Sequence, residues 1–160
     1  MFVNILGLGG NVGHFVFARL GPEMRDAMMR QALPFRGWLS PPADLAFRFI
    51  EAHKICYENR NKLMHSNIVT NSERAIVLYK TGRDGKTMLA NPTLKELRQV
   101  ADDMNTYTEF GMWVSNMIAF NLLGLTPRPG DRAFHAWPDK PPLPIPLEYT
   151  SDPTPIRSLD

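Results

Sequence analysis

The sequence predicts one mainly helical domain that carries a small antiparallel ribbon and ends in a proline-rich tail. Apolar side chains recur in steps of three and four over 42–66 and 97–118, which is typical of helices packed lengthwise against others. Between these helices, short β-branched and aromatic runs flank an Asp-Gly turn signal. Most of the fourteen prolines lie in the last part of the chain. We therefore expect a helical domain over 1–125 with a ribbon at about 67–90, and an extended arm over 126–160.

The composition is that of a globular protein. The chain has 160 residues, 44% of them hydrophobic and 21% charged, which suits one domain with a sizeable core and excludes a disordered or fibrous class. A net charge of +2 is too small to indicate nucleic-acid binding by itself. The single cysteine, Cys56, excludes an internal disulfide and fits a reducing compartment. The first twenty residues resemble neither a signal peptide nor a membrane span, so we expect a cytoplasmic protein with no membrane partner.

Glycine and proline divide the first third of the chain into short elements. We expect a short helix or strand over 1–9, a helix over about 11–20 and another over 23–33. Pro34 ends the third element, because proline cannot continue a helix. A loop rich in proline then leads to the long helix over 42–66.

The glycine-rich run over 7–13 imitates a dinucleotide-binding turn, because it follows an apolar stretch. Its last glycine comes one position late, however, and no strand-helix-strand repeat with a ribose-binding acid follows at the expected distance. We interpret the run as helix punctuation, and we expect no cofactor.

The ribbon and the second long helix have clear local signals. Three strands are expected, at 68–70, 75–79 and 87–89. Thr93 and Glu96 then have the spacing of a capping box, in which each side chain satisfies a backbone donor of the other residue. The helix that follows is expected to end at Gly124. Beyond it, aromatic side chains that include Tyr149 are candidates to pin the tail to the body or to a second subunit.

The most informative segment is the hexapeptide Arg-Asn-Lys-Leu-Met-His at 60–65, which closes the long helix. At about 100° per residue, Arg60 falls in the middle of an apolar stripe formed by Leu45, Phe49, Cys56 and Leu63. A guanidinium stays charged and is costly to bury alone, so something must meet it. Asn61 and His65 are four residues apart and therefore neighbours. A cation, an amide and a titratable imidazole around one patch indicate a phosphate site.

A second interpretation makes the same residues structural. Arg60 would then be a buried arginine paired with an acid of another helix, such as Asp102 or Asp103. His65 would cap the end of its helix, where a cationic imidazole is favoured by the helix dipole. Both interpretations are open at the level of sequence, because six-residue patterns recur by chance in many helices.

Other polar residues give weaker signals. Lys80, Arg83 and Lys86 cluster around the ribbon turn, where they form either a solvated hairpin or a weak electrostatic guide for RNA. The histidines outside the hexapeptide each lack a second ligand at metal spacing, so no metal site is predicted. His53 lies on the apolar stripe and is interpreted as a histidine satisfied within a core or an interface.

The hexapeptide and its surroundings resemble the HEPN superfamily, whose signature is an arginine, a polar residue, three further residues and a histidine. Arg60, Asn61 and His65 stand at those positions. The order of a long helix, a short ribbon and a second long helix is similar to that of small uncharacterised bacterial HEPN-like proteins. The likeness covers about residues 15 to 122.

The resemblance implies an all-α, up-and-down helical bundle with a β-ribbon insertion. It implies a homodimer in which two copies of Arg60 and His65 line one cleft. It also implies metal-independent endoribonuclease chemistry, with His65 as general acid or base, Arg60 neutralising the phosphate, and Asn61 holding the imidazole or a phosphate oxygen.

Some relatives act as toxins beside a nucleotidyltransferase-type antitoxin, or within defence systems. The resemblance thus implies an RNA substrate and a partner of this kind, and no residue of this sequence identifies that partner. Some relatives keep the fold without chemistry. The alternative is therefore a non-catalytic helical dimer that binds a nucleotide, RNA or a protein partner through the same cleft.

Overall fold

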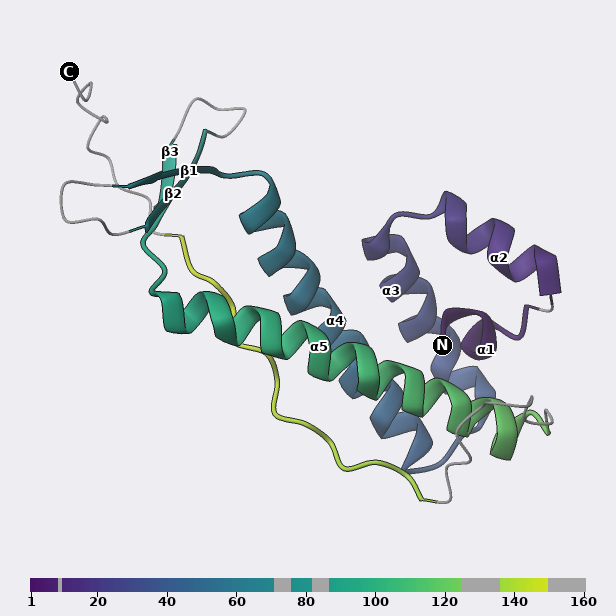
Figure 1. The fold of residues 1–160 in the computed structure, drawn as a ribbon. Helices are drawn as coiled ribbons and strands as arrows, with labels where there is room; N and C mark the ends of the chain where they lie inside the picture. Colours follow the sequence, from purple (N-terminus) through teal and green to yellow (C-terminus); the bar gives the residue numbers. More distant parts are fainter. Residues whose placement is uncertain (9, 71–75, 82–86, 125–135, 150–160) are drawn as a thin grey trace. The chain divides into compact units, whose positions relative to one another are not determined.

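The chain is mostly helical and carries one three-stranded antiparallel sheet (Figure 1). The computed structural model describes residues 1–8, 10–70, 76–81, 87–124 and 136–149. The helices are α1 (Phe2–Leu6), α2 (Gly10–Arg19), α3 (Pro22–Ala32), the 3₁₀ turn η1 (Leu33–Arg36), α4 (Pro42–Met64), α5 (Leu94–Met117) and the π-helical turn η2 (Ile118–Leu122). The strands are β1 (Asn67–Thr70), β2 (Ile76–Thr81) and β3 (Thr87–Ala90). The predicted order of short helices, long helix, ribbon and long helix is confirmed.

The chain divides into two compact units, and each unit is assembled from separate stretches of sequence. Unit 1 comprises Met1–Lys54 and Met104–Leu143, and unit 2 comprises Ile55–Asp103 and Pro144–Asp160. The long helices α4 and α5 each contribute one end to each unit. Each unit is described by itself below.

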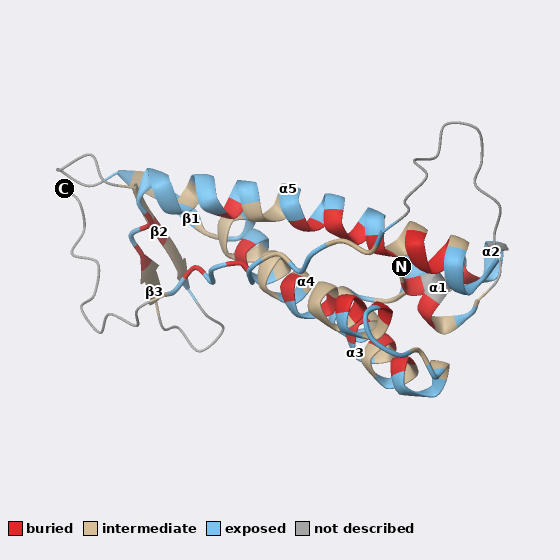
Figure 2. Cartoon of the chain, turned by 90° about the horizontal axis from the view of Figure 1, so that it is seen from below, coloured by how far each residue is buried: buried red, intermediate tan, exposed pale blue. Residues whose placement is uncertain are grey.

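The core of unit 1 joins the short N-terminal helices to the first half of α4. Its buried cluster consists of Phe2, Ile5, Met29, Leu33, Ala46 and Ile50. Gly7 ends α1 with a φ of 67°, a conformation that glycine adopts without strain. A dinucleotide-binding turn would follow a strand, but the element before the glycine-rich run is the helix α1, and the next element is the helix α2. The interpretation of the run as a break between helices fits this order. Figure 2 shows that α5 carries its buried residues along one side.

Gly111 of α5 allows a close approach to the ring of Phe49 within unit 1. A Cβ at Gly111 would lie 2.2 Å from Cε2 and 2.8 Å from Cδ2 of Phe49. Gly111→Ala is therefore expected to lower the free energy of unfolding by about 1–3 kcal/mol in urea titrations, because overpacking outweighs alanine's helix preference. An equal loss in a Phe49→Leu background would contradict the ring as the cause.

The ribbon of unit 2 is a meander in the order β1-β2-β3. Leu78 of the central strand pairs with Ile68 on one side and with Ala90 on the other. Leu78 is 1% exposed, so a buried apolar side chain lies at the centre of the sheet. The strands follow the predicted runs within one or two residues, because β-branched and aromatic side chains suit a pleated, half-buried surface.

The predicted capping box at the start of α5 is confirmed. Thr93 Oγ1 accepts a hydrogen bond from the Glu96 N–H at 3.2 Å, and Glu96 Oε2 accepts one from the Thr93 N–H at 2.6 Å. The Thr93 N–H, followed by the Thr93 hydroxyl, holds the pKa of Glu96 below its ordinary value. The helical path at the other end, through η2, stops just before Gly124, whose φ is 63°.

Thr93→Ala is expected to lower the melting temperature at pH 7, because it removes both side-chain hydrogen bonds of the capping box. A carboxyl whose pKa is lower in the folded state stabilises the fold above its unfolded pKa, and that stabilisation is lost as the pH falls through the folded pKa. The gap between wild type and variant should therefore narrow between pH 7 and pH 3 in thermal unfolding followed by circular dichroism. Thr106→Ala, at an exposed position within α5, should show no such narrowing.

Candidate functional site

Arg60 is exposed on α4, so the prediction that it occupies the middle of the apolar stripe is wrong for the single chain. The polar residue in the stripe is Asn59, which is 1% exposed. Asn59 follows Cys56 by three residues and Arg60 follows it by four, and either spacing keeps a residue on the same face of a helix. The prediction placed Arg60 in the stripe, whereas the structure places Asn59 there. A neutral amide can be satisfied by hydrogen bonds, whereas a guanidinium keeps its charge. The alternative of a buried arginine paired with Asp102 or Asp103 is wrong for the same reason.

The three motif residues lie at the end of α4. Asn61 is half-buried and His65 is exposed. The helix ends at Met64, and the His65 N–H still donates to the Asn61 carbonyl at 3.0 Å. Arg60 and His65 have no side-chain hydrogen bond or ion pair to another described residue. Both side chains are therefore open to a ligand or to a second molecule.

Two of the three basic residues assigned to the ribbon turn, Arg83 and Lys86, lie outside the described residues. Lys80 lies near the end of β2 and is half-buried. Its stem therefore contributes to the packing of the ribbon as well as to its charge. The idea that these residues guide RNA stays a prediction.

His53 is a satisfied histidine, as predicted. Its Nδ1 lies 3.2 Å from Oδ2 and 3.1 Å from Oδ1 of Asp26 on α3, within unit 1. The imidazole also stacks on Phe49, with ring centroids 5.8 Å apart. Because Asp26 is itself buried, the imidazole supplies a donor that this carboxylate needs. Across the part of the chain that the structure describes, no three His, Cys, Asp or Glu side chains are grouped to hold a metal ion.

Cys56 is a half-buried thiol and not an activated nucleophile. Burial, and secondarily the charge of Asp103, raise the pKa of Cys56 to about 11. A thiol with such a pKa is almost wholly protonated at neutral pH, and the thiolate is the reactive form. The side chain therefore acts in packing within unit 2.

Asn59 was missed at the level of sequence, and it is a buried polar residue of unit 2 whose amide makes two hydrogen bonds. Its Nδ2 donates to the Ile145 carbonyl and its Oδ1 accepts from the Leu147 N–H, each at 2.8 Å. Both partners belong to residues 144–149, which we call the tail segment. The Lys62 ammonium donates to the Leu147 carbonyl, and Tyr149 contacts Ser66 and the Lys62 carbonyl. Tyr149 thus pins the tail, as predicted. Helical spacing from Cys56 was the one signal in the sequence for Asn59.

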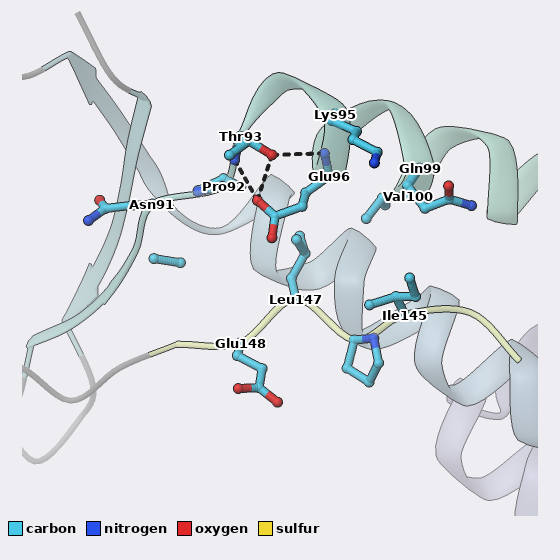
Figure 3. A pocket seen from close by; sticks show the side chains of 12 residues that line it. Asn91, Pro92, Thr93, Lys95, Glu96, Gln99, Val100, Ile145, Leu147 and Glu148 are labelled. Carbon is cyan, nitrogen blue, oxygen red and sulfur yellow. Dashed lines mark hydrogen bonds between the residues drawn. The ribbon is translucent and has the colours of Figure 1, made fainter. Parts of the chain in front are cut away.

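A pocket of about 630 Å³ lies in unit 2, where the start of α5 meets the tail segment (Figure 3). Val100, Leu147 and Pro92 supply apolar lining, while Glu96 and Glu148 supply carboxylates. The carboxylate of Glu96 already serves the capping box, as the dashed lines in Figure 3 show. One of the two carboxylates of the pocket lining is therefore engaged in the capping box.

The end of α4 remains the best candidate site, because Arg60 and His65 are exposed there, five positions apart, and neither side chain is paired with another described residue. None of the helices among the described residues is both long enough and apolar enough to cross a membrane. No protein-family model, no curated protein and no solved structure matches this chain.

Proposed function

We propose that this protein is a HEPN-like homodimer that cleaves RNA without a metal ion, in the manner of a toxin or a defence ribonuclease. The observation that carries the proposal is the exposure of Arg60 and His65 at the end of α4, where no described residue of the chain bonds to their side-chain polar groups. Side chains that a fold leaves free are available for an anion such as the RNA phosphate.

The chemistry follows from the residue types. A ribose 2′-hydroxyl attacks the adjacent phosphate, and the proton that it loses goes to a base while the leaving oxygen gains one from an acid. His65 takes one of these roles, since histidine is the side chain that most often serves as a general acid or base. Arg60 binds two phosphoryl oxygens with its planar fork and neutralises the charge that develops on them. Asn61 orients the imidazole or a phosphate oxygen.

The requirement for a second subunit follows from the openness of the site. Catalysis needs groups held in position, and an exposed arginine and an exposed histidine on one helix are not held. Met64 lies within the hexapeptide and Ile68 follows it in the same unit; each is 65% exposed and offers apolar surface for a second copy. A homodimer built through this end would cover the apolar residues and bring two motifs to one cleft.

A non-catalytic binding module is the second candidate, and it is favoured by the same lack of fixed geometry around Arg60. Exposed cations suffice to bind a phosphate backbone, whereas acid-base chemistry requires orientation. In this alternative the homodimer binds RNA, a nucleotide or a protein partner through the end of α4 without cleaving anything.

The test is incubation of the purified protein with labelled RNA in EDTA, beside Arg60→Ala and His65→Ala variants, with oligomeric state measured by light scattering. Cleavage by the wild-type dimer that both variants lose is the expected result. RNA binding that Arg60→Ala loses, without cleavage by wild type, would favour the binding module. A monomer that neither binds nor cleaves RNA would overturn both candidates.

A further inference from the structure

The tail segment is held in unit 2 through its main chain. Beyond the two hydrogen bonds to Asn59, the Ile145 N–H donates to Oδ2 of Asp103 at 3.2 Å. The Leu147 carbonyl accepts from Lys62. Side chains of α4 and α5 thus satisfy the N–H and C=O groups of Ile145 and of Leu147. A neighbouring strand does the same for an extended chain that joins a sheet.

Two side chains of the tail segment are buried, and their shape decides which segments can bind in the same way. Leu147 is 7% exposed and Pro144 is buried, while Ile145, Pro146 and Glu148 face outward. Figure 3 shows Leu147 projecting from the tail toward Glu96 and Val100 at the start of α5. Pro146 has no N–H to satisfy, and it stands between the carbonyl and the N–H that Asn59 bridges. The seated pattern is therefore a proline, any residue, a proline and a leucine.

The earlier part of the tail is held in the same way within unit 1. Arg48 Nε donates to the Pro141 carbonyl at 2.9 Å. The Tyr107 hydroxyl lies 3.0 Å from the Pro141 carbonyl and 2.9 Å from the Pro142 carbonyl. Recognition of main-chain carbonyls by side chains is thus a repeated device of this protein, and it suits prolines, whose carbonyls are open because regular pairing is lost.

We propose that Asn59, Lys62 and Asp103 form a receptor for an extended Pro-x-Pro-Leu segment, which residues 144–149 occupy in this chain and which a partner protein's segment of the same pattern can fill. The class of ligand follows from the seated tail, which shows what the receptor fits. Proline pre-orders such a segment, so little conformational entropy is lost on binding. The proposal does not depend on any action on RNA.

The attached tail competes with every ligand that arrives from outside. A covalently attached segment has a high effective concentration, so the receptor of the wild-type chain is occupied most of the time. A partner's segment binds when the contacts between the tail and the receptor are weakened. It also binds when that segment makes more contacts with the receptor than the tail does. The receptor must therefore be tested in a full-length chain whose own tail has been disabled.

The experiment uses the full-length Leu147→Asp chain, which keeps the receptor but places a carboxylate where leucine is seated. A fluorescein-labelled peptide of residues 142–149 is titrated with this chain and with wild type, and anisotropy is followed. The peptide should bind the variant chain about tenfold or more tightly than it binds wild type. If Leu147→Asp does not fold, Leu147→Ala replaces it.

Two controls identify the receptor. A peptide with aspartate in place of its leucine should not bind, and adding Lys62→Ala or Asn59→Ala to the tail-disabled chain should abolish binding of the unchanged peptide. Lys62→Ala is included because Lys62 is half-buried and its loss leaves the buried amide of Asn59 in place. Equal affinity for wild type and the tail-disabled chain, or no binding to either, would overturn the proposal.

Discussion

His65→Ala should slow the proposed cleavage of RNA by about 100- to 10,000-fold, the range in which a positioned general acid or base contributes. Arg60→Ala should slow it by about 100- to 1,000-fold, as the loss of one donor to a developing negative charge does. Both effects should appear in the rate at saturating RNA under single-turnover conditions. The reason is that each group acts on charge or on a proton that moves in the transition state.

Stability measurements separate these effects from unfolding. Because Arg60 and His65 are exposed, their replacement should change the free energy of unfolding by less than about 0.5 kcal/mol. His65→Gln is a matched variant, since glutamine keeps a polar side chain but cannot act as an acid or a base. Cleavage that survives in His65→Gln would remove His65 from acid-base chemistry.

Asn59→Ala should lower the free energy of unfolding by about 2–4 kcal/mol. The amide is buried, and its two 2.8 Å hydrogen bonds satisfy the Ile145 carbonyl and the Leu147 N–H. Alanine leaves both main-chain groups without their partner and opens a void beside the tail. Urea unfolding followed by circular dichroism measures the loss.

Arg60→Ala is the control for Asn59→Ala, because it removes a longer side chain from the next position of the same helix. Its effect should be small, since Arg60 is exposed. If both variants lost the same free energy, the loss at Asn59 would not be specific to its contact with the tail, because alanine improves helix propensity at both positions. An Asn59→Ala chain as stable as wild type would show that water replaces the amide at no cost.

Most of the fold was predictable because its signals are local. Thr93 and Glu96 are three residues apart, and the strand runs are bounded by turn residues, so short-range chemistry decides these elements. The η1 turn was not predicted, because Pro34 was expected to stop helical structure, whereas a 3₁₀ turn accommodates it near its start. The HEPN-like bundle itself stays a prediction.

The site was predicted less well, because burial on a helix depends on what covers each face. From Cys56, steps of three and four are both helical, and they lead to Asn59 and to Arg60. The choice between them is made by Ile145 and Leu147, which lie far along the chain. No local pattern carries that information. Arg60, Asn61 and His65 lie at the end of the helix as predicted, but Arg60 is exposed there and does not stand in the apolar stripe.

The link between Asn59 and Leu147 spans 88 residues and has a consequence for biosynthesis. At about 5–20 residues per second, the ribosome makes Leu147 roughly 4 to 18 s after Asn59. Throughout that interval water must solvate the Asn59 amide, because the tail segment that later covers this end of α4 has not yet been made. Unit 2 therefore reaches its final packing after translation has passed residue 147, while the local capping box and ribbon can form earlier.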